Sequence, residues 1–81
     1  MKLARDVSGE ELIREVKRYG YQVTRQTGSH VRLTSYFTNK EHHITIPQEN
    51  PLKVGTLNSI LNDIADYLEI DKQTLEAELF R

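Results

Sequence analysis

The order of hydrophobic and polar positions predicts a helix, a set of strands and a second helical region. Apolar residues recur at helical spacing after Ser8, then alternate with polar residues between positions 21 and 46. Spacings of three and four positions are typical of an amphipathic helix, whereas strict alternation is typical of half-buried antiparallel strands. Helical spacing returns at Leu57 and continues to Leu68. The chain is therefore expected to pass from helix to sheet and back to helix.

The first helix is expected to span about Gly9 to Tyr19. Ser8 and Glu11 have the spacing of a capping box, in which each side chain satisfies a free amide of the first turn. Gly20 is suited to the left-handed conformation that ends many helices. The apolar stripe of this helix consists of Leu12, Ile13, Val16 and Tyr19.

Three strands are expected between Tyr21 and Pro47. Gly28 and Ser29 supply the first turn and the Thr38–Asn39 region the second, because these residue types favour turns. Pro47 has no amide hydrogen to donate to a neighbouring strand, so it ends the third strand. The apolar residues of the alternating pattern are Tyr21, Val23, Val31, Leu33, Ile44 and Ile46. The last four of these are expected to face the core.

Two helical segments are expected after a loop at Gln48 to Val54. The longer carries Leu57, Ile60, Leu61, Ile64 and Leu68, and a short terminal helix begins after Asp71. Amphipathic helices must cover one face of the sheet. The predicted fold class is α+β: one domain over residues 1–81, an α-β-β-β-α sandwich with a three-stranded antiparallel sheet, helices on one face and a short C-terminal helix. In outline it resembles a double-stranded-RNA-binding domain.

The other face of the sheet is expected to be open and polar. Pairing Leu33 with Ile44 would place Arg32 opposite Thr45, and Thr34 opposite His43. None of the residues assigned to this face is acidic, which suits a phosphate backbone or a partner strand. A plain solvated face is the alternative. The residues assigned to it are Gln22, Thr24, Gln26, His30, Arg32, Thr34, His43 and Thr45.

Charge and composition narrow the classes of function. The net charge is -1, but the residues up to Ile46 carry eight Lys/Arg against five Asp/Glu, and the rest carry three against seven. A basic half can attract phosphate despite a neutral total. The chain has no cysteine, no apolar run long enough for a membrane span, and no signal-peptide stretch at Met1–Asp6. A cytoplasmic protein without membrane contact is therefore expected.

A run of sequence motifs extends from Ser8 to Ile64. The central motif is Gly28-Ser29-His30, preceded by Arg25-Gln26 and followed by Val31-Arg32-Leu33. The others are the helix ending in glycine and an aromatic residue, the Ile44-Thr45-Ile46-Pro47 block and the segment from Gly55 to Leu61. Together these motifs resemble the HicA family of toxins, and five blocks in the right order are far more specific than Gly-Ser-His alone.

The resemblance implies a type II toxin–antitoxin endoribonuclease that cleaves mRNA and is neutralised by a HicB-type antitoxin. It implies His30 as the catalytic residue, with no cofactor and no metal. Imidazole titrates near neutral pH and can act as an acid or a base. Ser29 and the local amides would hold a phosphate, and Arg25 and Arg32 would contact phosphate or stabilise developing charge. Gln26 and His43 complete the expected RNA-binding set.

Two departures from the family keep an alternative open. Many members have a histidine two residues after the third-strand proline, where this chain has Glu49, and members are usually strongly basic. A catalytically weakened RNA- or protein-binding module is therefore the second hypothesis. Glu49 is interpreted as a solvated loop carboxylate, with a second acid–base group as the alternative. His42 and His43 are not expected to chelate one metal, because adjacent strand residues point to opposite faces. Self-association through the acidic C-terminal segment stays open.

Overall fold

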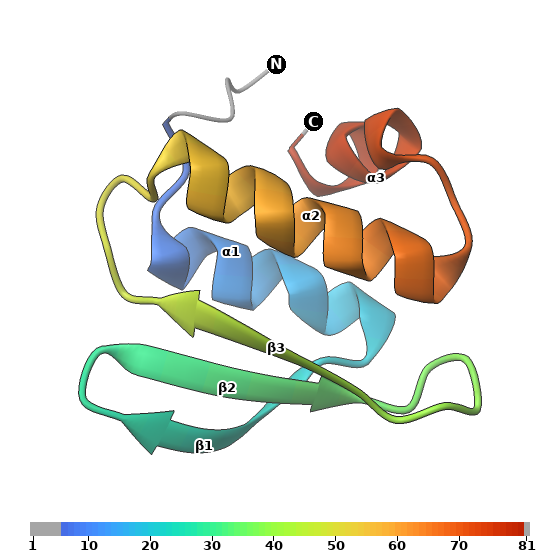
Figure 1. Ribbon diagram of the computed structural model, residues 1–81, viewed down its shortest axis with the longest axis horizontal. Helices are drawn as coiled ribbons and strands as arrows, with labels where there is room; N and C mark the ends of the chain where they lie inside the picture. The colour runs from blue at the N-terminus through green and yellow to red at the C-terminus, as the bar shows by residue number, and fades with distance from the viewer. Residues whose placement is uncertain (1–5, 81) are drawn as a thin grey trace.

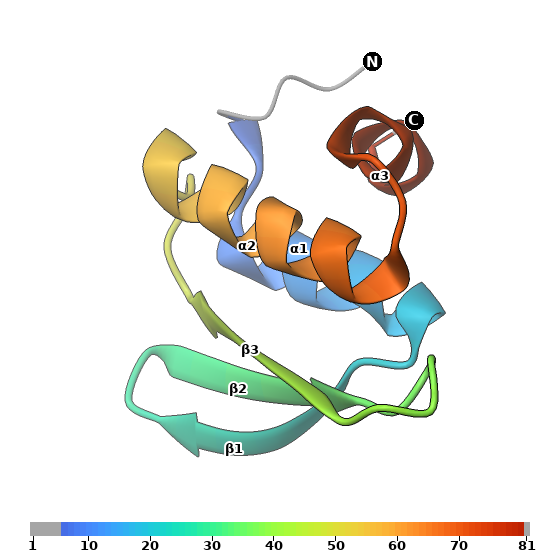
Figure 2. The same cartoon turned by 45° about the vertical axis from the view of Figure 1, so that its right-hand side comes forward.

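The computed structural model describes residues 6–80 and confirms the predicted α+β fold. The elements are α1 (Gly9–Val16), η2 (Lys17–Tyr19), β1 (Gln22–Thr27), β2 (His30–Ser35), β3 (His42–Pro47), α2 (Val54–Leu68) and α3 (Lys72–Leu79). The strands form one antiparallel sheet in the order β1-β2-β3. Figure 1 and Figure 2 show α1 and α2 over one face of this sheet, with α3 farther from it. The other face, which none of the helices within residues 6–80 covers (Figure 1 and Figure 2), is called the outer face below.

Two expectations from the sequence concern membranes and secretion, and the described residues bear on only one of them. The expected lack of a signal peptide concerns the first six residues, and all of these except Asp6 lie outside the described range. Among residues 6–80, no helix has both the length and the apolar character that crossing a bilayer would require.

The ends of the first helix follow the predicted signals. The Ser8 hydroxyl accepts a hydrogen bond from the Glu11 amide at 3.0 Å, which caps the first turn. Gly20 has a φ of 80°, in the left-handed region where glycine is favoured. The predicted extent of Gly9 to Tyr19 is confirmed, although the last three residues form a 3₁₀ turn.

The core lies between the sheet and the helices and extends to α3. Asp71 caps α3 by accepting a hydrogen bond from the Thr74 amide at 2.8 Å. Leu75, Leu79 and Phe80 of the terminal segment are buried, so they pack on the chain's own core. The buried apolar residues are Val7, Leu12, Val16, Tyr19, Tyr21, Val31, Leu33, Ile44, Ile46, Leu52, Leu57, Ile60, Leu61, Ile64, Ala65, Leu75, Leu79 and Phe80.

The start of α1 lies directly against the end of β3. The Gly9 amide donates a hydrogen bond to the Glu49 carbonyl at 2.8 Å. A Cβ atom on Gly9 would lie 2.0 Å from the Pro47 carbonyl oxygen, which is far inside van der Waals contact. This close approach of two backbone segments requires glycine at position 9.

Val23 is not buried in the core, although it belongs to the alternating apolar pattern. Val23 pairs with Leu33, so it is on the inward side of the sheet as predicted, but it is 48% exposed. Strand β1 is an edge strand, and α1 and α2 pack over β3 rather than over β1 (Figure 1). The helical layer therefore ends before it covers β1.

Candidate functional site

The pairing of β2 with β3 places the expected residues on the outer face. Arg32 pairs with Thr45 and Thr34 pairs with His43, as predicted. Directly opposed residues of an antiparallel pair lie on the same face. His30 also lies on this face, two residues before Arg32 on the same strand.

The first strand departs from simple alternation. A β-bulge lies between Val23 and Arg25, and Arg25 pairs with Arg32 whereas Gln26 pairs with the buried Val31. A bulge inserts one residue and reverses the alternation beyond it. The prediction that Gln26 faces outward is therefore wrong. Its amide instead donates to the Gln48 side chain at 3.2 Å, and Arg25 takes the outward position.

His30 is the first residue of β2 and is exposed. It pairs with Thr27 on one side and Pro47 on the other. The turn before it depends on Gly28, whose φ is 58°, and a Cβ there would meet nothing within 4 Å. Gly28 is therefore needed for its backbone angle, and the space above the turn is open.

The turn that carries His30 is tied to the segment after β3. The exposed Ser29 accepts a hydrogen bond at its carbonyl from the Gln48 amide at 2.7 Å. Within residues 6–80, the His30 side chain has no hydrogen bond or ion pair. An imidazole held on a fixed backbone with both nitrogens free can accept or donate a proton from either nitrogen.

Arg25 and Arg32 face each other across the β1–β2 pair, and both are exposed. Among the residues that the structure describes, neither arginine has an ion pair. Like charges directly opposite one another destabilise a sheet. Two such guanidinium groups suit an anion that would lie between them, and they lie about 7 Å along the strand from His30.

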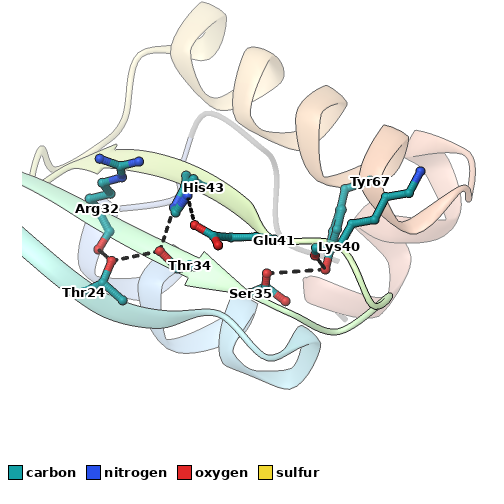
Figure 3. Close-up of polar contacts among 8 residues, drawn as sticks. All are labelled: Thr24, Arg32, Thr34, Ser35, Lys40, Glu41, His43 and Tyr67. Carbon is teal, nitrogen blue, oxygen red and sulfur yellow. Dashed lines mark hydrogen bonds and ion pairs between the residues drawn. The ribbon is translucent and has the colours of Figure 1, made fainter.

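His43 belongs to a chain of polar contacts that crosses the sheet (Figure 3). Thr24 and Thr34 hydroxyls are 2.9 Å apart, and the Thr34 hydroxyl is 2.7 Å from His43 Nδ1. His43 Nε2 is 2.6 Å from the Glu41 carboxylate. Glu41 is an acidic group beside the outer face that the alternation did not reveal.

The position of His43 separates it from His30. The pairing places it opposite Thr34, which is four residues from His30, or about 14 Å along the strand. Both of its ring nitrogens have partners. His43 therefore cannot act on the same bond as His30, although it lies on the same face.

His42 lies on the opposite side of the sheet from His43, as adjacent strand residues must. Its ring stacks on Tyr67 with centroids 4.6 Å apart, and its Nδ1 is 2.7 Å from the Tyr21 hydroxyl. Burial lowers the pKa of His42 below its ordinary value of 6.5, with Asp63 opposing the effect. Burial also raises the pKa of the Tyr21 hydroxyl. This cluster attaches α2 to the sheet, a role that sequence reasoning missed.

The cluster around His42 predicts a pH-dependent stability. Because the pKa of His42 is lower in the folded state, the unfolded chain binds more protons below about pH 6.5. The free energy of unfolding should therefore be highest above pH 6.5 and fall as the pH drops through the folded pKa. Urea unfolding at a series of pH values measures this. In His42→Gln the fall attributable to this group should disappear, and an unchanged pH profile would contradict the assignment.

Glu49 occupies a different environment from the one expected. It lines a small depression at the start of α1 together with Ser8, Glu10, Gln48 and Asn50. Its Oε1 atom is buried and has no hydrogen-bond partner among residues 6–80. The interpretation of Glu49 as a solvated carboxylate is therefore wrong for this oxygen.

Comparison with known proteins identifies the family. The family model described as HicA toxin of bacterial toxin–antitoxin systems matches residues 9–65. The chain belongs to the HicA toxin family. No curated protein and no solved structure matches it. The match agrees with the range of the resemblance found in the sequence, Ser8 to Ile64.

The HicA match covers the part of the fold that positions the outer face. It runs from the first residue of α1 to Ala65 near the end of α2, and so includes all three strands and His30. Helix α3 lies outside it, although Leu75 and Leu79 bury their side chains in the same core. As a HicA family member, the protein is a toxin of a toxin–antitoxin pair.

Proposed function

We propose that this HicA family toxin is an endoribonuclease that cleaves mRNA with His30 as its catalytic acid–base residue and without a metal ion. The observation that carries the proposal is the juxtaposition on the outer face of an exposed imidazole and two arginines, none of which has a side-chain partner of opposite charge among residues 6–80. The first group can transfer a proton, and the other two can hold a phosphate. An open, shallow face suits an extended polymer better than a small metabolite.

The proposed reaction uses the 2′-hydroxyl of the RNA as the nucleophile. The 2′-oxygen loses its proton and bonds to the adjacent phosphorus, and the bond from phosphorus to the 5′-oxygen breaks. The 5′-oxygen gains a proton, which leaves a 2′,3′-cyclic phosphate and a 5′-hydroxyl. His30 would carry one of the two proton transfers and water the other. Arg32 and Arg25 would stabilise the negative charge that develops on the phosphate oxygens.

The antitoxin would act by covering this face. Pairing with an antitoxin follows from the family, and we propose that the partner is of the HicB type and shields His30. An antitoxin that presents carboxylates to Arg25 and Arg32 would also neutralise the charge of these two guanidinium groups.

Expression in bacteria tests the proposed function. Induction of the wild type should stop growth and fragment mRNA, while His30→Ala should leave growth and RNA intact. Co-expression of an antitoxin encoded beside the gene should restore growth. If both forms are harmless at equal soluble levels and RNA stays intact, the protein is not a ribonuclease toxin, and the binding-module alternative takes its place.

Replacing either arginine of the pair is expected to make RNA binding less dependent on salt without lowering the stability of the fold. Each arginine that contacts a phosphate of single-stranded RNA adds about 0.7 to the slope of log affinity against log salt concentration. Arg25→Gln and Arg32→Gln should each reduce the slope by about that amount. Because each change relieves a like-charge pair, the urea midpoint should not fall. Arg14→Gln is the control, since Arg14 lies on α1 and already faces Glu10 at 3.7 Å. Equal slopes in all forms would exclude the pair as a phosphate site.

A further inference from the structure

Tyr36 continues the outward series of β2 beyond the end of the strand. Its side chain is 67% exposed, although it is a large aromatic group. It borders a depression of about 350 Å³ on the outer face, called here the outer-face depression. The residues that line this depression are Thr24, Arg25, Arg32, Thr34, Tyr36, Glu41 and His43.

The loop that carries Tyr36 is held by hydrogen bonds on both sides. The Tyr36 carbonyl accepts from the Asn39 amide at 3.2 Å, which closes a turn. The Tyr67 hydroxyl accepts from the Thr38 amide at 3.0 Å. It also donates to the Lys40 carbonyl, as Figure 3 shows. The backbone under Tyr36 is therefore fixed while its ring stays open to solvent, so little order has to be gained before the ring binds a ligand.

The charges beside Tyr36 indicate what that ligand is. Arg25 and Arg32 line the same depression and have no ion pair among the described residues, while Glu41 is engaged by His43. An exposed aromatic face beside unneutralised guanidinium groups is the combination that binds single-stranded nucleic acid, with bases stacked on the ring and phosphates on the cations. The larger depression between β3 and α2 contains Asp63 and, within the described residues, no Lys or Arg.

We propose that Tyr36 forms a stacking subsite for one unpaired base of the RNA, at the far end of the outer face from His30. The inference rests on the proposed function and adds a second anchoring point to it. Tyr36 lies six positions after His30, one residue beyond the end of β2, which corresponds to about 20 Å along the strand direction. At about 3.4 Å per stacked nucleotide, that distance spans about six nucleotides, and fewer if the RNA is extended. The subsite would therefore require single-stranded RNA that reaches beyond the cleaved bond.

Binding of 2′-O-methyl RNA tests this subsite, because the modified sugar lacks the proposed nucleophile and stays intact. For an unstructured oligonucleotide of about ten nucleotides, Tyr36→Ala should weaken binding by about 5- to 100-fold. Tyr36→Trp should bind within about twofold of the wild type, because it keeps a stacking face. Phe37→Ala is the matched control. Phe37 is the adjacent exposed aromatic residue, but it packs edge-on against Tyr19 and does not line the depression.

A set of oligonucleotides with a single abasic position identifies stacking as the cause. At one position of the oligonucleotide, removal of the base should weaken binding by the wild type and should not weaken binding by Tyr36→Ala any further. Equal binding by the wild type and Tyr36→Ala, or an alanine effect that no abasic position removes, would overturn the proposal.

The same assays separate this inference from the proposed function. If unmodified RNA is cleaved but Tyr36→Ala binds normally, the stacking subsite is wrong and the ribonuclease stands. If binding depends on Tyr36 but no RNA is cleaved, the subsite stands and catalysis is wrong. If the wild type neither binds nor cleaves RNA, both are wrong.

Discussion

Gly9→Ala is expected to destabilise the fold by about 3 kcal/mol, a large part of the total stability of so short a chain. The added methyl group would meet the Pro47 carbonyl oxygen at 2.0 Å and the Gln48 Cα at 3.1 Å. Both are backbone atoms, so no side-chain rotation relieves the contact. Separating the segments would stretch the hydrogen bond from the Gly9 amide to the Glu49 carbonyl. Urea unfolding of the purified variant measures the loss.

Gly55→Ala is the matched control for that change. Gly55 lies in the first turn of α2, and a Cβ there would meet nothing within 4 Å. Alanine is favoured over glycine in helices by up to about 1 kcal/mol, so this variant should be as stable as the wild type or more so. If Gly9→Ala were as stable as Gly55→Ala, the close approach of α1 to the end of β3 would be contradicted.

His30→Ala is expected to reduce the rate of RNA cleavage by about 10²- to 10⁴-fold, the range typical for loss of a general acid or base. Because the His30 side chain is exposed and has no hydrogen bond among the described residues, its removal should leave the fold unchanged. Single-turnover cleavage at saturating protein separates this rate from RNA affinity. Affinity for 2′-O-methyl RNA should change little.

His43→Ala is the comparison that distinguishes catalysis from binding. His43 is on the same face as His30 but about 14 Å away along the strand. Its loss should therefore change the affinity for RNA but leave the cleavage rate at saturating protein within about tenfold of the wild-type rate. A rate loss in His43→Ala as large as that in His30→Ala would contradict the assignment of separate roles.

Most of the fold follows from periodicity and capping in the sequence. Ser8, Gly20 and Asp71 mark helix ends, because their side chains or backbone angles satisfy or end a turn at one position. The pairing of Leu33 with Ile44 follows from the hydrophobic alternation, since a shift of one residue would expose the apolar set. These signals are local, which is why sequence alone predicts them.

What the sequence did not predict depends on contacts between distant segments. The bulge after Val23 moves Arg25 outward and Gln26 inward, and the residues of β1, almost all polar, give no apolar pattern from which to detect it. The exposure of Val23 depends on how far the helices extend over the sheet. The stacking of His42 on Tyr67 joins positions 25 residues apart in the sequence and has no local signature.

The candidate site was predicted in part. The outward placement of His30 and Arg32 came from alternation, but the catalytic role given to His30 came from the family resemblance and not from geometry. The opposed arginines and the outer-face depression became visible only once the register of β1 was known. Tyr36 lay beyond the predicted outward set, because its position depends on the loop bonds made by Tyr67.

The most direct test of the central claim is cleavage of one RNA oligonucleotide by the purified wild-type protein in EDTA, with analysis of the product ends. A copy with 2′-deoxyribose throughout is run beside it, and His30→Ala is the enzyme control. We expect cleavage of the RNA alone, by the wild type alone, to 2′,3′-cyclic phosphate and 5′-hydroxyl ends. Intact RNA in EDTA, cleavage of the deoxy copy, or equal cleavage by His30→Ala would contradict a metal-independent ribonuclease that acts through His30.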